Sequence, residues 1–261
     1  MEFFDSHSHY NDEKFDEDRK NIIEETYKDG ITKFICAGYD ILSSKKSLQI
    51  SNKYDYIYSI CGISPNDVPE DLSKIDNMLE ELENIIKNDA KHKIVAIGEI
   101  GLDYYWNKEN KDIQKELFVR QIQLANKYNL PIVIHTREAL EDTISILKEN
   151  LVENKGIFHC CPLNRELVKQ ALNLDFYISF AGPITFKNSK NAGEVVNMVP
   201  LDRILIETDS PYLSPEPKRG RRNDSRNVKY VAEKVAEFKN LGLEEIAKIT
   251  YNNAKKIFKI M

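Results

Sequence analysis

The 261-residue sequence predicts a single α/β domain spanning residues 1–261 and folded as a (β/α)8 TIM barrel. Eight short apolar runs recur at intervals too long for β-hairpins, and segments with helical periodicity separate many of them. Some runs, such as residues 132–134, are continuously apolar, as expected of strands covered on both faces. No GxGxxG motif follows an early strand, which favours a closed barrel over an open doubly wound sheet.

The expected strands and helices follow one another along the chain. Residues 111–128 form the clearest helix, with Ile113, Leu117 and Leu124 on one apolar stripe. Pro131 prevents its continuation, because proline cannot extend a helix and restrains the residue before it. The expected strands are residues 2–5, 32–37, 56–62, 94–99, 131–135, 156–160, 176–180 and 203–207. The expected helices are residues 17–28, 71–89, 111–128, 137–150, 164–173, 226–239 and 243–259.

The composition excludes several classes of protein. The chain is 41% hydrophobic and contains 13 tyrosines and 11 phenylalanines, which is too apolar for a disordered protein. It has no run near the roughly 18 apolar residues of a membrane helix, and its N-terminus lacks the pattern of a secretory signal. We therefore expect a cytoplasmic protein, without a membrane partner and monomeric. The net charge of −5 argues against binding nucleic acid over the whole surface, but not against a local basic patch.

The cysteines give no sign of a disulfide framework. Cys36, Cys61, Cys160 and Cys161 show no CxxC spacing, and a vicinal pair is a poor structural disulfide. Each lies within or at the end of an apolar run, so we expect reduced and buried side chains. An incidental metal contact by Cys160 or Cys161 is the alternative.

Histidine is scarce, and its positions follow the predicted strands. Four of the five histidines stand where a strand is expected to end, and two acidic residues hold equivalent positions. Because the C-terminal ends of barrel strands converge at one mouth, we expect these side chains to meet there. The remaining histidine, His92, lies in a polar stretch and is expected in a solvated loop. The six candidates at the mouth are His7, His9, Glu99, His135, His159 and Asp209.

This set of imidazole and carboxylate groups predicts metal ions. His7 and His9 are two residues apart, so a strand projects both to the same side. Six ligands are too many for one tetrahedral ion but suit two divalent ions held roughly 3.5–4 Å apart, with Glu99 as the bridge. The ligands admit Zn, Mn, Co or Fe, and Mg less comfortably, so the ion is not identified. Such a pair activates water and clamps an ester or a phosphate, which favours hydrolysis.

Longer motifs occur in a fixed order along the chain: DSHSH, GEIGLDYYW, PIVIHTREA, HC at residues 159–160, ETDSPYL and RGRRN. In their order and spacing, from residue 5 to about 258, they resemble the TatD family of metal-dependent deoxyribonucleases. The resemblance implies a barrel of the metallo-dependent hydrolase type that cleaves phosphodiester bonds of DNA, commonly as a 3′-to-5′ exonuclease supported by Mg or Mn. It implies one metal site formed by His7, His9, Glu99 and Asp209, and another formed by Glu99, His135 and His159.

Other residues near the predicted mouth are candidates for substrate contact. The family usually has GxHP after the third strand, whereas Ser64 stands here in place of that histidine. A hydroxyl can hydrogen-bond a phosphate, but it cannot carry charge or transfer a proton near neutral pH as imidazole does. Tyr104, with the two aromatic residues that follow it, could stack a terminal base or pack within its loop. Arg137 could contact substrate or cap the following helix.

A basic segment at residues 218–226 follows the last strand. It includes Arg219 and Arg222, which we expect to overhang the mouth and hold phosphates flanking the cut, with a solvated loop as the alternative. The expected substrate is DNA, as a single strand or a 3′ end. In the expected reaction, Glu99 bridges the ions and Asp209 takes a proton from the attacking water.

Three other functions remain open at this level. An amidohydrolase acting on an amide, lactone or small ester also opens with HxH, although Glu99 stands where such enzymes often carry a modified lysine. Hydrolysis of the ester of aminoacyl-tRNA is a second alternative, because a two-metal site does not distinguish carbon from phosphorus esters. A nucleic-acid-binding protein with decayed catalysis is a third, suggested by Ser64.

Overall fold

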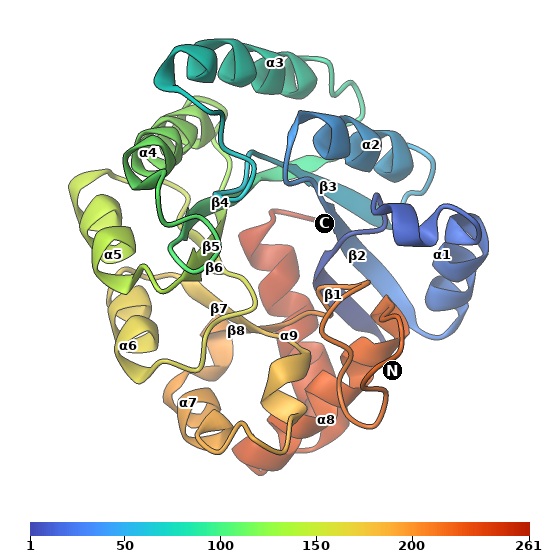
Figure 1. Cartoon of the computed structure of the whole chain (residues 1–261). Helices are drawn as coiled ribbons and strands as arrows, with labels where there is room; N and C mark the ends of the chain where they lie inside the picture. The colour runs from blue at the N-terminus through green and yellow to red at the C-terminus, as the bar shows by residue number, and fades with distance from the viewer.

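Eight parallel strands close into a barrel in the computed structural model, which describes residues 1–261. Each strand pairs with the next one in chain order, and helices surround the sheet (Figure 1). The last seam joins β1 (Phe3–Ser8) to the segment after β8 (Ile204–Ile206). There the Asp209 N–H donates to the carbonyl of His7, and the His9 N–H donates to the carbonyl of Ser210. The predicted (β/α)8 barrel is confirmed.

All eight predicted strands are present, and three of them, the first, fourth and fifth, continue beyond their predicted ends. The fourth was expected to end at Glu99 but continues to Asp103, across an irregularity in its pairing with β5 between Ile97 and Ile100. The other strands are β2 (Ile31–Ala37), β3 (Ile57–Cys61), β4 (Ile94–Asp103), β5 (Ile132–Arg137), β6 (Gly156–Phe158) and β7 (Tyr177–Phe180). The helices are α1 (Arg19–Lys28), α2 (Ile41–Ser51), α3 (Ile75–Lys87), α4 (Lys111–Lys127), α5 (Leu140–Glu149), α6 (Arg165–Asn173), α7 (Ala192–Met198), α8 (Val228–Lys239) and α9 (Leu243–Ile257).

Two of these helices, α2 and α7, were not predicted. The buried face of α2 carries four serines and only two apolar residues, Leu48 and Ile50, so the helix lacks a clear apolar stripe. The Ser47 hydroxyl donates to the carbonyl of Cys36 at 2.5 Å and lies 2.6 Å from the Ser59 hydroxyl. Ser44 lies against Gly38, where even a β-carbon would come within 2.4 Å of the serine hydroxyl oxygen. Small hydroxyl side chains therefore let α2 pack directly on the barrel backbone. Helix α7 has only seven residues, too few to show a clear helical periodicity of apolar residues.

The interior of the barrel is apolar at the end opposite the histidines. Phe4, Ile60 and Leu205 belong to one buried cluster with Phe258 and Ile260, which follow α9. Figure 1 shows α9 crossing the barrel, with the C-terminus near its centre. Burying these side chains stabilises the fold by about 1.5–3 kcal/mol each. The polar side chains at the mouth of the barrel therefore lie above a packed apolar core.

Three of the four cysteines are buried, as expected from the sequence. Cys36, Cys61 and Cys161 are free and buried, and Cys160 is free and half-buried. Burial raises the pKa of the Cys61 thiol to about 12, so this thiol is not reactive. No helix has both the length and the apolar character needed to span a membrane.

The serine face of α2 can be tested by removing one hydroxyl. We expect Ser47→Ala to lower the free energy of unfolding by about 1–3 kcal/mol, because buried partners lose a hydrogen bond that water cannot replace. Urea unfolding followed by circular dichroism measures this change. Ser145→Ala, at an exposed position of α5, is the control and should stay within about 0.5 kcal/mol of wild type. Equal effects of the two substitutions would contradict this account of α2.

Candidate metal centre

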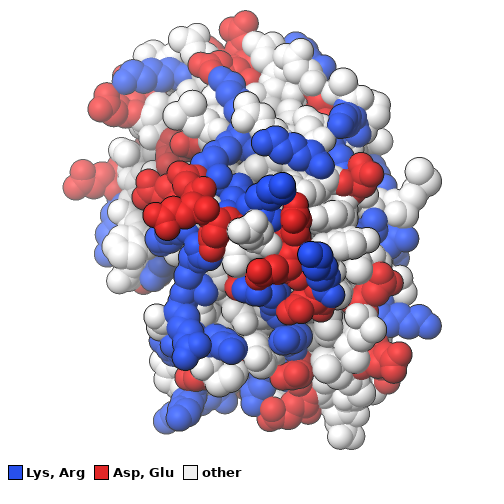
Figure 2. Space-filling view, turned by 90° about the vertical axis from the view of Figure 1, so that its right-hand side faces the viewer, with Lys and Arg blue, Asp and Glu red and all other residues white.

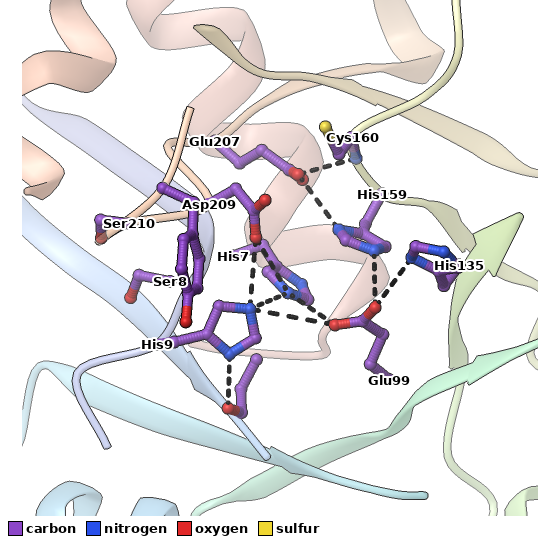
Figure 3. A network of polar contacts seen from close by, with 12 residues as sticks. His7, Ser8, His9, Glu99, His135, His159, Cys160, Glu207, Asp209 and Ser210 are labelled. Carbon is purple, nitrogen blue, oxygen red and sulfur yellow. Dashed lines mark hydrogen bonds and ion pairs between the residues drawn. The ribbon is translucent and has the colours of Figure 1, made fainter. Parts of the chain in front are cut away.

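The six residues expected at the mouth do meet there, and Figure 3 shows their side chains pointing toward one another. They come from five strands, where they lie in the C-terminal half of the strand or just beyond its end. His7 lies in β1 and His9 directly follows it, Glu99 lies within β4, and His135 lies in β5. His159 follows β6, and Asp209 follows β8. Barrel topology thus gathers residues that are far apart in the sequence.

Glu99 lies between two groups of histidines. Its Oε1 is 2.9 Å from Nδ1 of His135 and 3.2 Å from Nε2 of His159. Its Oε2 is 3.5 Å from Nε2 of His7 and 3.9 Å from Nε2 of His9. The two oxygens of one carboxylate therefore face different ligand groups, which is the arrangement that a bridging ligand requires.

His7, His9 and Asp209 form one compact group. The Nε2 atoms of His7 and His9 are 3.2 Å apart, and Nε2 of His9 is 3.2 Å from Oδ1 of Asp209. Two ligand atoms bound to one ion at about 2.1 Å lie roughly 3.0–3.4 Å apart, so these separations suit a common ion. A second set of ligand atoms, from His7, Glu99 and His159, also lies close enough to share an ion.

Several histidines are oriented through the ring nitrogen that faces away from the cluster. Nδ1 of His9 lies 3.0 Å from the carbonyl of Ala37, and Nε2 of His135 lies 2.9 Å from Oδ2 of Asp103. Nδ1 of His159 lies 3.3 Å from Oε1 of Glu207. An acceptor at this position holds the proton there and leaves the opposite nitrogen free to bind a metal.

Asp103 and Glu207 were not among the predicted site residues. Both belong to motifs noted in the sequence, GEIGLDYYW and ETDSPYL, and both are buried. The chemistry of histidine could have pointed to them. A metal-binding histidine needs an acceptor for its second nitrogen, and a buried acid beside a strand end can supply one.

One buried nitrogen provides a direct test of whether the site fits a cation. Nε2 of His159 is buried and has no hydrogen-bond partner, although Oε1 of Glu99 is 3.2 Å away. An unsatisfied buried polar atom costs about 1–3 kcal/mol. A cation bound by both atoms would satisfy the nitrogen, so the residues present fit the metal that the motifs imply.

The charges within the cluster are strongly coupled. Burial acts to raise the pKa of Glu99, but the charge of His159 and a hydrogen bond from His135 outweigh it, and this pKa lies well below its usual value. Burial acts to lower the pKa of His159, but the Glu99 and Glu207 carboxylates raise it well above its usual value. Ionised carboxylates thus hold protons on nearby histidines. A divalent cation would displace those protons on binding.

The cluster opens into a cavity of about 780 Å³. Ser64 and Arg137, two of the predicted substrate contacts, line it together with Tyr39, Trp106 and Tyr212. The Ser64 hydroxyl donates to Asp67 Oδ2 at 2.5 Å, so it is already engaged within its own turn.

The other three predicted contacts do not line this cavity. Tyr104 is buried, and its hydroxyl donates to Asp142. The guanidinium of Arg219 lies 3.8 Å from the centre of the Phe186 ring. Arg222 donates to both carboxylate oxygens of Asp18. Figure 2 shows how basic and acidic side chains interleave on the face that lies at the right-hand side of Figure 1.

An eight-stranded barrel with histidines and carboxylates at its mouth is typical of metal-dependent hydrolases. Residues 4–259 match the model of the family described as TatD related DNase, and the chain belongs to this family. It is 46% identical over 258 residues to the uncharacterized metal-dependent hydrolase YabD of Bacillus subtilis, covering 98% of this chain and 99% of that protein. It is 40% identical over 207 residues to the metal-dependent hydrolase YcfH of Escherichia coli K12, covering 79% and 75%.

Solved structures show the same fold. The TatD homologue YjjV of Escherichia coli superimposes with a TM-score of 0.90 at 25% identity, covering 99% of this chain and 98% of that one. The phosphotriesterase homology protein of Escherichia coli, solved with phosphate in its active site, gives a TM-score of 0.74 at 14% identity, with 98% of each chain covered. The chain is therefore a member of a metal-dependent hydrolase family.

Metal binding can be tested on one of the clustered histidines. We expect the chelator-treated protein to bind Zn, Mn or Mg with release of protons, and His159→Ala to weaken this binding at least about tenfold. Isothermal titration calorimetry in buffers of different ionisation enthalpy measures both the metal affinity and the number of protons released. His92→Ala, in an exposed turn remote from the cluster, is the matched control and should bind as wild type does. Equal affinity in both variants would exclude His159 as a ligand.

Proposed function

We propose that the chain hydrolyses phosphodiester bonds of DNA with two divalent ions, Mg, Mn or Zn, and removes nucleotides from the 3′ ends of single strands. The observation that carries this proposal is the position of Glu99, whose two oxygens face different ligand groups. The ligands proposed for one ion are His7, His9, Glu99 and Asp209, and those for the other are Glu99, His135 and His159. The family description supports DNA as the substrate.

When bound, the ions supply Lewis acidity, which polarises phosphoryl oxygens and acidifies water. Glu99 keeps the two ligand groups at a fixed spacing. Asp209 lines the cavity with one carboxylate oxygen held by His9, so it can accept a proton from the attacking water. As the water oxygen adds to phosphorus, the P–O3′ bond breaks and the leaving oxygen takes up a proton. Arg137, exposed and lining the cavity, can offset charge on the phosphate.

The role of Asp209 as proton acceptor predicts a loss of rate without a loss of folding. We expect Asp209→Asn to lower kcat on DNA by about a hundredfold or more, which is the lower range for general-base catalysis. Metal content is measured in the same preparations, and Glu99→Gln is treated in the same way. Asp202→Asn, whose carboxylate pairs with Arg203 on the surface, is the control. Near wild-type hydrolysis by Asp209→Asn or Glu99→Gln with normal metal content would overturn these roles.

The choice of substrate is tested with end-labelled single-stranded and double-stranded DNA and RNA, each with Mg, Mn or Zn and with a chelator control. We expect metal-dependent, stepwise loss of 3′ nucleotides from single-stranded DNA. Internal fragments in the first minutes, or no cleavage of any polymer, would contradict an exonuclease. Release of an amino acid from aminoacyl-tRNA, without release of nucleotides, would identify a carbon ester as the substrate.

A further inference from the structure

A large aromatic side chain stands exposed at the rim of the cavity. Trp106, the one tryptophan in the chain, lines the cavity with its side chain 69% exposed. Tyr105 beside it is 42% exposed, and the two rings meet edge to face with centres 4.7 Å apart. Aromatic surface left in water beside a binding site is available for contact with a ligand.

The turn that carries Trp106 is anchored to the metal centre. One carboxylate oxygen of Asp103 accepts the backbone N–H groups of Tyr105 and Trp106, both at 2.9 Å. The other oxygen lies 2.9 Å from Nε2 of His135, whose opposite nitrogen faces Glu99. A single buried carboxylate therefore fixes both the backbone under the indole and the orientation of a proposed metal ligand. The backbone that carries the indole is thus held in place relative to His135.

Arg137 adds a positive charge to this surface. Its guanidinium carbon lies 3.9 Å from the centre of the Tyr105 ring and 5.5 Å from the centre of the Trp106 ring. No carboxylate pairs with it, in contrast to Arg222 and Arg226 of the basic segment. The chain is fixed here as well, because the carbonyl of Arg137 accepts the N–H of Tyr104. An aromatic face and an unpaired cation together match a nucleotide, which offers a flat base and a phosphate.

We propose that Trp106 and Arg137 form a platform on which an unpaired nucleobase of the substrate strand stacks, next to the metal centre. The inference rests on the proposed function in that it takes a nucleic acid strand as the substrate. It adds the residue that selects unpaired ends, because a base within a duplex already stacks on its neighbours and must be freed before it can cover Trp106. Trp106 is thus a specificity-determining residue, while catalysis stays with the ion ligands.

Because Trp106 is the one tryptophan, its fluorescence reports on the platform without any turnover. The protein is excited where tyrosine does not absorb and titrated with single-stranded decathymidylate, in chelator and again with Mg. A phosphorothioate at the 3′-terminal linkage slows hydrolysis. We expect saturable quenching of the emission. A fully abasic decamer of equal charge should quench little and bind at least fivefold more weakly, the lower range for loss of one stacked base.

Binding of a labelled strand to variants, measured by anisotropy, separates stacking from charge. We expect Trp106→Ala to weaken binding of decathymidylate at least fivefold but leave the abasic strand unaffected, and Trp106→Phe to restore part of the loss. Arg137→Ala should weaken both strands. Tyr27→Ala is the control, because Tyr27 is 43% exposed but stacks on Tyr56 and does not line the cavity.

The two proposals fail in different ways. Hydrolysis of DNA by wild type, with no quenching and equal kcat/KM in Trp106→Ala, would overturn the platform and leave the nuclease proposal standing. Base-dependent quenching without cleavage of any polymer would support the platform and overturn the nuclease. Equal quenching by decathymidylate and the abasic strand would also overturn the platform, because the indole would then report phosphate contact.

Discussion

The candidate metal centre depends on how the barrel closes. His9 and Asp209 are 200 residues apart in the chain, yet they lie on either side of the seam between β1 and the segment after β8. Asp5 joins the two sides, because its carboxylate accepts both the N–H and the hydroxyl of Thr208, at 2.9 and 2.5 Å. Burial disfavours the ionised carboxylate and raises the pKa of Asp5 to about 7, although these hydrogen bonds act to lower it. The contacts that close the sheet therefore also set the spacing of the ligands.

Strand β4 has a comparable double role on the other side of the mouth. Continuing past Glu99 to Asp103, it supplies the central carboxylate and then the acceptor for His135. The turn that follows it carries Trp106. A shift of this strand would move the ion ligand, the orienting carboxylate and the indole together. Because α4 packs beside β4 and Gln114 holds the N–H of Asp103 at 2.8 Å, the strand has little freedom to shift.

The barrel and the convergence of six residues were predictable because both follow from periodicity and topology. Buried strands have continuous apolar sequences, and the C-terminal ends of parallel barrel strands must meet at one mouth. What could not be predicted depends on side-chain direction. Tyr104 and Trp106 share one aromatic run, but the backbone turns the hydroxyl of Tyr104 to Asp142 and leaves Trp106 at the cavity. Helix α2 was missed because hydrogen-bonded serines occupy most of its buried face.

The proposed polyanionic substrate has to be reconciled with a net charge of −5, and the distribution of charge shows how this could occur. Two arginines of the basic segment are already engaged, since Arg222 pairs with Asp18 and Arg226 pairs with Asp224 and Glu25. The cavity itself holds the carboxylates of Glu99, Asp67 and Asp209, which alone repel phosphate. The divalent ions that we propose would reverse that local sign on binding there. In the proposed function, binding of ions and binding of the strand would therefore be thermodynamically coupled, and each would raise the affinity for the other by the same factor.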